Sequence, residues 1–444
     1  MTDAALPIRP ATAPTAAPDI ATKDPAPSRP SAARGALRGW WRRRPVHRGL
    51  VLLHRWPGLV LGLLLVVECT SGAVLLYDAE IFRATNGGLY RHTAAASPIT
   101  PDRAVAVVKA AHPGFDAIWV AEDKGVLVVG DPAYHTQWFV DPGTGRINGH
   151  GSLDTGFMGL LVNLHDCAFS CEGYPGYQPW FDVEVWKAGP TFLDGITRGG
   201  LILGVVGLSL ILLVATSVKI WWPGRKRLKQ RLVVRRGRGR FARDYDLHNV
   251  IGAVALPFLL MWGITGAAFE FPVVENTWLA LTGGDKPATE TYAVTPNPAA
   301  AGRPRITTAQ ATDAALAEVP GRVSFVGLPT KDAPYYEVDI ITSYASSEHR
   351  AIYRGDAYVY LDAHDATNVH VADEGTGPAA NRFYDKYLEP THFGWNVNAW
   401  WRAVWAVLGL APLALMVTGV STWWFRRGVR RRRERARAER RTAA

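Results

Sequence analysis

The apolar residues of this chain gather into four long runs that are separated by much more polar sequence. The runs cover roughly residues 50–77, 199–222, 248–270 and 400–425. Each is long enough to cross a bilayer as a helix, which takes about 20 residues. Paired tryptophans close the second and fourth runs, as interfacial anchors do. The pattern predicts an α-helical membrane protein with four transmembrane helices.

Charge is distributed very unevenly around these runs. Residues 225–243, between the second and third runs, carry ten basic side chains and no acidic one. The long segments 78–198 and 271–399 carry 14 acidic against 8 basic and 16 acidic against 9 basic side chains. Short basic segments stay in the cytoplasm, so both termini and the middle loop are expected inside and the two long segments outside. This asymmetry argues against the alternative, buried helices of a large soluble protein.

The topology accounts for the formal net charge of +10, so no nucleic acid is expected as a partner. The lipid bilayer is the expected partner instead, and the cytoplasmic membrane is the expected location, with multiple spans and both termini cytoplasmic.

Each of the two outside segments combines a helical pattern with alternating, strand-like stretches. The first has a helix-like run broken at His112-Pro113, and then GVLVVGD and TQWFVDPGTGRI. The second has ITTAQATDAALAEVPG, and then YYEVDIIT and AYVYLDA. Each half of the chain is therefore expected to be span, α+β domain, span. Two such direct repeats would be related by an axis along the membrane normal.

The predicted organisation has nine segments along the chain. They are a disordered basic cytoplasmic tail (1–45), TM1 (46–78), a first extracytoplasmic domain with a cysteine-containing insertion (79–198), TM2 (199–223), a basic cytoplasmic loop (224–247), TM3 (248–270), a second extracytoplasmic domain (271–399), TM4 (400–425) and a basic cytoplasmic tail (426–444).

Two histidines begin apolar runs in matching sequence frames. His54 precedes a Ser-Gly pair by 17 and 18 residues, and His248 precedes a Thr-Gly pair by the same intervals. Both spans run outward, so both histidines are expected near the cytoplasmic face. His165 and His392 come before the two inward-running spans and are expected near the outer face.

Depth alone therefore pairs His54 with His248 and His165 with His392. A single histidine at a membrane edge often only hydrogen-bonds there, but facing histidines in a helical bundle can hold a haem iron through both axial positions. A bond from His54 to His165 would have to bridge a hydrocarbon layer of ~30 Å. Small residues that would let the flat macrocycle approach are Gly58, Gly252 and Gly394.

Several motifs together resemble the PepSY-associated transmembrane family over roughly residues 46–428. They are the HRW motif at 54–56, the Ser-Gly and Thr-Gly pairs, IWWPGR at 220–225, LHN at 247–249 and THFG at 391–394. The resemblance implies four helices with extracytoplasmic PepSY-like domains and, in some members, di-haem reduction of ferric siderophores. It implies an inner haem on His54 and His248 and an outer haem on His165 and His392. The stretch DCAFSCEGYPGYQPWFDVEVWKAG after His165 departs from the family as an insertion.

Other residues near the membrane are candidates for support roles. Glu68 lies inside the first run, where an ionisable group is costly, and it could accept a hydrogen bond from a ligating imidazole. A structural carboxylate is the alternative. Arg55, Arg198 and Arg402 could pair with haem propionates or serve as interfacial anchors.

The cysteines bear on how a haem would be attached. Cys167 and Cys171 are expected outside, where they could form a disulfide or remain free thiols. No C-x-x-C-H motif is present for covalent attachment. Two non-covalent, bis-histidine b-type haems are therefore the expected cofactors.

The sequence predicts a transmembrane electron carrier that reduces an iron(III) chelate or siderophore outside. No nucleotide-binding glycine motif is present, so a separate cytoplasmic reductase or membrane quinol would be the electron donor. The alternative is an anchored PepSY module that binds or inhibits an extracytoplasmic peptidase, without redox activity. A solute transporter is disfavoured, because no span shows a mid-membrane break with paired polar residues.

Overall fold

The computed structural model describes most of the chain outside the N-terminal 44 residues. The described residues are 45–133, 135–185, 195–222, 224, 226, 228–286, 292–342, 355, 357–372 and 377–442. The tail predicted over 1–45 lies outside them except for Pro45. Residues 186–194, which include the last four residues of the predicted insertion, also lie outside them.

The apolar runs form long helices, as their composition predicts. They are α2 (Pro45–Val60), α3 (Gly62–Leu75), α7 (Arg198–Trp221), α9 (Arg240–Glu270), α14 (Ala399–Gly409) and α15 (Ala411–Thr442). Within the described residues, three helical segments are long and apolar enough to cross a membrane, and a fourth is added if α2 and α3, which are bent by 61°, form one span. Pro57, one turn before this bend, cannot donate a helical hydrogen bond. The helix predicted as TM3 begins earlier than expected, at Arg240 of α9. The helix predicted as TM4 ends later than expected, because α15 continues to Thr442.

These helices pack through small residues. A side chain at Gly207 of α7 would meet the Ala267 backbone nitrogen of α9 at 2.8 Å, and one at Gly204 would meet the Phe271 ring at 2.2 Å. Inside a membrane the hydrophobic effect does not drive helices together, so close packing at small residues of this kind stabilises their association instead. The buried residues between the helices come from α3, α7, α9 and α15: Leu65, Val206, Leu210, Val214, Ala255, Leu259 and Ala411.

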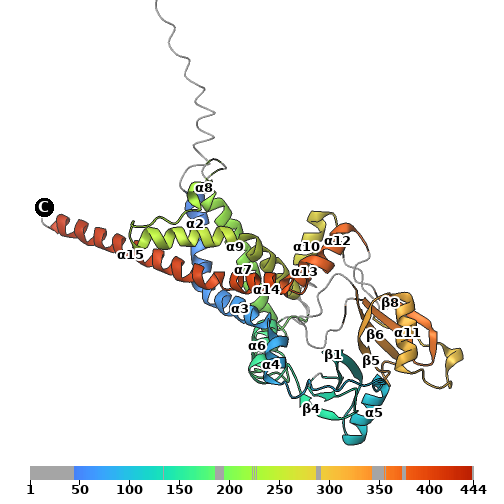
Figure 1. Ribbon diagram of the computed structural model, residues 1–444. Coiled ribbons are helices and arrows are strands. Elements are labelled where there is room, and N and C mark those ends of the chain that lie inside the picture. The colour runs from blue at the N-terminus through green and yellow to red at the C-terminus, as the bar shows by residue number, and fades with distance from the viewer. Residues whose placement is uncertain are drawn as a thin grey trace, which may run out of the picture. The chain divides into compact units, whose positions relative to one another are not determined.

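The strands of both long segments belong to one antiparallel sheet. They are β1 (Trp119–Asp123), β2 (Val126–Gly130), β3 (Gln137–Val140), β4 (Ile147–Gly151), β5 (Arg322–Gly327), β6 (Tyr335–Ile341), β7 (Ala357–Asp362) and β8 (Asp365–Ala372). Their order is β4-β3-β2-β1-β5-β6-β7-β8 (Figure 1). The prediction of two separate domains therefore differs from the structure, because β1 pairs with β5 and joins the two segments.

Each half contributes one helix and four strands in the same order. Helix α5 (Pro101–Ala111) precedes β1 to β4, and α11 (Thr308–Glu318) precedes β5 to β8. Both helices pack on valines and other buried residues of one sheet face. Asp102 of α5 accepts hydrogen bonds from the backbone nitrogen of Thr308, at 3.1 Å, and from its hydroxyl, at 2.8 Å. The predicted repeat is therefore visible in the element order.

Shorter elements complete the chain between the spans and the sheet. They are α4 (Asp78–Thr85), α6 (Gly156–Cys167), α8 (Leu228–Arg231), α10 (Pro272–Thr282), the 3₁₀ turn η3 (Pro298–Ala300), α12 (Ala379–Phe383), the π-helical turn η5 (Tyr384–Leu388) and α13 (Glu389–His392).

The last hairpin of each half is closed by an equivalent aspartate. Asp141, after β3, accepts from the backbone and hydroxyl of Thr93 and from Gly143 and Thr144, at 2.8–2.9 Å. Asp362, at the end of β7, accepts from the backbone nitrogens of Asn297 and His364 in the same way. Burial raises the pKa of Asp141, but these hydrogen bonds outweigh it and hold the pKa below its ordinary value.

We predict that replacing Gly130 by alanine destabilises the sheet. Gly130 lies opposite Trp119 in the β1–β2 pair, and a methyl group there would fall 1.8 Å from the buried indole. Overpacking of this kind costs about 1–3 kcal/mol, so the midpoint of thermal unfolding should fall by several degrees. Gly114→Ala is the matched control, since nothing lies within 4 Å of its added carbon. Equal midpoints for the two variants would contradict this packing.

We also predict that Asp141 contributes to the loss of stability in acid. Since its pKa is lowered by folding, its contribution is complete above the unfolded value of about 3.9 and is lost as the pH falls through the folded value. Unfolding midpoints measured from pH 6 to pH 3 should therefore fall less steeply for Asp141→Asn than for the wild type. Asp313→Asn, at an exposed site on α11, should follow the wild-type slope.

Candidate functional site

The structure brings the four predicted histidines together in two pairs. His54 of α2 faces His248 of α9, with ring centres 6.4 Å apart. His165 of α6 faces His392 at the end of α13, with ring centres 6.3 Å apart. The members of each pair come from different halves of the chain, as depth along the spans predicts.

In the first pair, each histidine is held by the span that follows it. Nδ1 of His54 lies 3.2 Å from the Thr216 hydroxyl of α7 and 3.2 Å from the carbonyl oxygen three residues before it. Nδ1 of His248 lies 3.0 Å from the Thr418 hydroxyl of α15 and 3.1 Å from the carbonyl oxygen three residues before it. The two halves therefore use the same contact.

In the second pair, each histidine is held by the span of its own half that precedes it. Nδ1 of His165 lies 3.1 Å from the Ser71 hydroxyl and 2.9 Å from the Glu68 carbonyl oxygen, both of α3. Nδ1 of His392 lies 2.7 Å from the Thr265 hydroxyl of α9. The Ser-Gly and Thr-Gly pairs that match in the sequence thus hold this second histidine pair. We call each hydroxyl residue that contacts a histidine Nδ1 in this way the seat of that histidine.

The hydroxyl groups define which ring nitrogen carries the proton. Each hydroxyl donates its single hydrogen to a carbonyl oxygen of its own helix, at 2.7–2.9 Å for Thr216, Thr418, Ser71 and Thr265. The hydroxyl oxygen is then an acceptor toward the histidine, so Nδ1 must be the donor in the neutral imidazole. All four histidines therefore present the lone pair of Nε2, the arrangement that metal-ligating histidines commonly have.

Glycine follows the hydroxyl residue in three of the four seats. A side chain at Gly72 would meet His165 Cε1 at 2.6 Å, one at Gly419 would meet His248 Cε1 at 3.4 Å, and one at Gly266 would meet His392 Cε1 at 3.6 Å. These glycines leave room for the imidazole rings. The sequence suggested Gly58, Gly252 and Gly394 for a different role, the approach of a haem macrocycle, which stays a prediction; carbons added at these glycines would meet leucine side chains at 3.6, 3.6 and 3.1 Å.

Each histidine pair offers only two ligands, so it suits a metal whose remaining ligands come from a cofactor. Within the described part of the chain, no group of three or more His, Cys, Asp or Glu side chains could hold a bare metal ion. Two metal–imidazole bonds of ~2 Å, with each nitrogen about 1 Å from its ring centre, would separate the ring centres by ~6 Å. The two observed separations fit axial ligation of one iron per pair, and haem binding itself stays a prediction.

Charged groups lie close to the second pair. Oε1 of Glu68 is 3.1 Å from Nδ1 of His165, so the predicted contact between an intramembrane carboxylate and an imidazole is present. Burial, with His165 nearby, lowers the pKa of His392 to about 3. Burial raises the pKa of Asp166, and His165 partly offsets this. A neutral His392 is the form that can bind a metal.

The three predicted arginines have protein partners. Arg402 is buried, donates to the Leu76 carbonyl and to Glu80, and lies 4.6 Å from the Tyr77 ring centre. Arg198 donates to the Trp180 carbonyl at 3.2 Å and lies over that indole ring. Arg55 lies 5.4 Å from the Trp56 ring centre.

Cys167 and Cys171 are joined by a disulfide at the end of α6, directly after the turn that carries His165. The insertion therefore begins with a closed five-residue loop, and neither sulfur is available as a thiol.

The seats Thr216 and Thr418 were missed from the sequence, as was the helix that carries His165. One signal could have found the seats, because Thr216 and Thr418 each stand five residues before the tryptophan pair that closes their run, just as Ser71 and Thr265 stand in matching frames. Helix α6 is rich in apolar residues, but its 12 residues are too few to span a membrane, so the pattern did not set it apart from the domain around it.

The family model of the PepSY-associated TM region matches residues 51–426, which is most of the chain. No curated protein matches the chain. The matched region contains the apolar helices, the eight-stranded sheet and both histidine pairs. The chain therefore belongs to the PepSY-associated transmembrane family and is a membrane protein.

Proposed function

We propose that this protein carries electrons across the cytoplasmic membrane through two haems and reduces ferric chelates on the outer side. The observation that supports this is the pair of facing histidine sites, each with ring centres 6.3–6.4 Å apart and each imidazole held at Nδ1. Family membership gives the membrane setting but does not distinguish this role from a peptidase-binding one.

His54 and His248 would hold the inner haem, and His165 and His392 the outer one. Bound haem would supply an iron that accepts and releases one electron at a time. Because no covalent attachment motif is present and Cys167 is bonded to Cys171, both haems would be b-type.

The protein side chains would fix and tune the ligands. The acceptors at Nδ1, a hydroxyl for all four histidines and also a carbonyl for His54, His165 and His248, would orient each imidazole and raise its basicity, as partners of metal-bound histidines do. His165 alone has a carboxylate, Glu68, beside its Nδ1. The outer pair is thus built asymmetrically, with a more strongly donating histidine on one side.

Electrons would enter from the cytoplasmic side and leave outside. The basic loop and both basic tails favour a cytoplasmic location for the chain ends. The donor would be a separate cytoplasmic reductase or membrane quinol, and the acceptor an iron(III) chelate such as a siderophore.

The first prediction here is that the purified protein, made with ample haem, contains two haems per chain with a Soret band and dithionite-reducible α-bands. His248→Ala should remove one spectroscopic centre, and His392→Ala should remove the other and abolish reduction of an external chelate. His150→Ala, at an exposed site on β4, should keep both.

A colourless wild-type protein would overturn the electron-transfer role and favour the peptidase-binding alternative. If His54→Ala and His392→Ala removed the same centre while His248→Ala left it intact, the pairing would be wrong.

The second prediction uses the glycine seats of the outer pair as a matched comparison. Gly72→Ala places a methyl group 2.6 Å from His165 Cε1, whereas Gly266→Ala places one 3.6 Å from His392 Cε1, an ordinary contact. Haem per chain should fall from two toward one in the first variant and stay at two in the second, measured as pyridine haemochrome. The idea fails if Gly72→Ala retains both haems with wild-type spectra.

A further inference from the structure

Two short helical segments lie at the end of the bundle from which the chain passes to the sheet. Helix α10 begins at Pro272, two residues after α9 ends at Glu270, and α12 with η5 leads through α13 to α14. The side-chain nitrogen of Asn396, just before α14, donates to the Tyr387 carbonyl oxygen of η5 at 2.9 Å. Both segments are therefore fixed at the level where one span ends and another begins.

Helix α10 is apolar on two opposite sides. Leu279 is buried against Ala268 of α9 and Tyr384 of η5, so one side is already packed. Val273, Thr277 and Leu281 recur at every fourth position and are exposed along another side. Leu281, which is 81% exposed, is the most exposed large apolar side chain in the described part of the chain. A helix that is apolar on every side is expected in apolar surroundings.

The second segment continues this exposed apolar surface. The rings of Phe383 and Tyr387 are about half exposed and stack on each other, with centres 6.1 Å apart. Asn381 accepts from the Asp285 backbone nitrogen and donates to the Asp285 carbonyl oxygen, each at 2.9 Å. These bonds tie the chain just after α10 to α12, two residues before Phe383. The exposed residues of α10 and of η5 therefore belong to one helical unit.

The exposed surface of this unit carries little charge. All residues of 272–282 and 379–388 are described, and Arg382 is the one charged side chain among them that is exposed. The other three, Glu275, Asp385 and Lys386, are half-buried. A surface that faces water usually has the opposite arrangement, with charged side chains outside.

The equivalent helix of the first half has a different surface. Helix α4 also follows a span, but its charged side chains are Asp78, Glu80 and Arg83, and its Phe82 is buried in the core beside the sheet. No large apolar side chain of α4, all of which the structure describes, is exposed. The exposed apolar face of α10 therefore does not follow from its place after a span alone.

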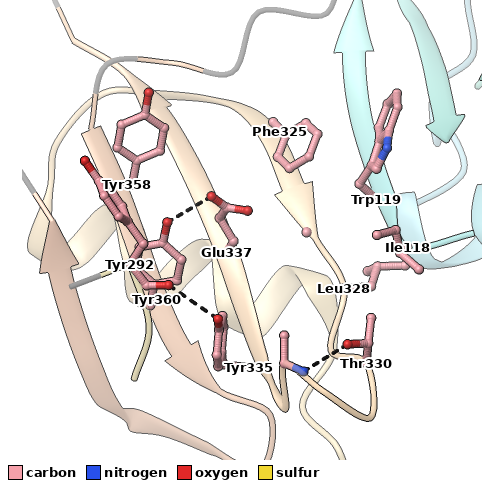
Figure 2. Close-up of a pocket in the computed structure, with 12 residues that line it drawn as sticks. Ile118, Trp119, Tyr292, Phe325, Leu328, Thr330, Tyr335, Glu337, Tyr358 and Tyr360 are labelled. Atoms are coloured by element: carbon pink, nitrogen blue, oxygen red, sulfur yellow. Dashed lines mark hydrogen bonds between the residues drawn. The ribbon is translucent and has the colours of Figure 1, made fainter. Parts of the chain in front are cut away.

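The aromatic side chains of the sheet find their partners within the protein. Figure 2 shows Tyr335 and Tyr360 beside a cavity of about 500 Å³, with ring centres 5.6 Å apart. The Tyr360 hydroxyl donates to Glu337 at 3.0 Å, and Trp119 across the cavity also has partners. The exposed apolar residues of α10 and η5 instead face away from the core that their own helices form.

We propose that the exposed face of α10 and η5 binds the lipid surface, with Val273, Leu281, Phe383 and Tyr387 in the interfacial layer of the bilayer. Exposed apolar patches mark protein or membrane contacts, and here the patch is continuous with the ends of two spans, where aromatic side chains favour the interface. Arg382 can reach lipid phosphate while its stem lies along the apolar layer. The inference goes beyond the proposed function, since it requires neither haem nor electron transfer.

Photo-crosslinking tests the proposal on the full-length protein in nanodiscs of palmitoyl-oleoyl phosphatidylcholine. Benzoylphenylalanine at Leu281 or at Phe383 should, after irradiation, raise the protein mass by one phospholipid. Val407, 69% exposed in the apolar helix α14, is the matched position that should also give a lipid adduct. Asp313, at an exposed site on α11, should give none. A lipid adduct at Val407 but not at Leu281 or not at Phe383 would overturn the proposal, as would a crosslinked dimer in place of the lipid adduct.

Solute accessibility provides an independent measurement. Leu281→Cys and Asp313→Cys, each combined with Cys69→Ser and spin-labelled, should differ in collision rates with oxygen, which concentrates in lipid, and with a nickel chelate, which stays in water. The ratio of oxygen to nickel collisions should be higher at position 281. Equal ratios at the two positions would contradict lipid contact. Both readouts are independent of haem content, so failure here is separable from failure of the electron-transfer role.

Discussion

The hydrogen bond between each histidine Nδ1 and a backbone-anchored acceptor on a neighbouring helix is the constraint on which the membrane part of this protein depends. A hydroxyl whose hydrogen is already donated within its own helix can only accept from the imidazole. This one contact sets the tautomer, leaves Nε2 as the ring nitrogen with a free lone pair, and ties the helix that carries each histidine to a span. Because an unpaired polar group inside a membrane costs several kcal/mol, the contact also helps to hold the helices in register.

The repeat makes the same contact four times, but not identically. In the first pair, a histidine at the start of one span reaches the next span, whereas in the second pair the histidine lies outside the long spans and reaches back. Only the seat of His165 includes a carboxylate, and only the insertion after His165 is closed by a disulfide. The two halves therefore differ most around the outer histidines, and the seat at Thr265 is the simpler one.

The sequence predicted the apolar helices, the repeat and the pairing of the histidines, because each follows from periodic pattern and length. The seats Thr216 and Thr418 were not predicted, because several hydroxyl residues lie in these runs and each of these two threonines already donates to a carbonyl of its own helix, so only their matching positions before the tryptophan pairs set them apart. The union of the two sheets was not predicted either. Alternating residues define a strand's two faces, but an edge such as that of β1 carries backbone groups that any strand can pair with.

That union has a consequence for how the chain is assembled during synthesis. The outer edge of β1, at residues Trp119–Ala121, finds its partner only at Phe325–Gly327, about 200 residues later in the chain. At roughly 5–20 residues per second, the first four strands wait on the order of ten seconds or more with an open edge. An open strand edge is a template for wrong pairing. The first segment is completed only after two further helical spans have been inserted and the second segment has reached the same side of the membrane. Half of this protein is therefore not a self-sufficient unit, although its sequence reads as one.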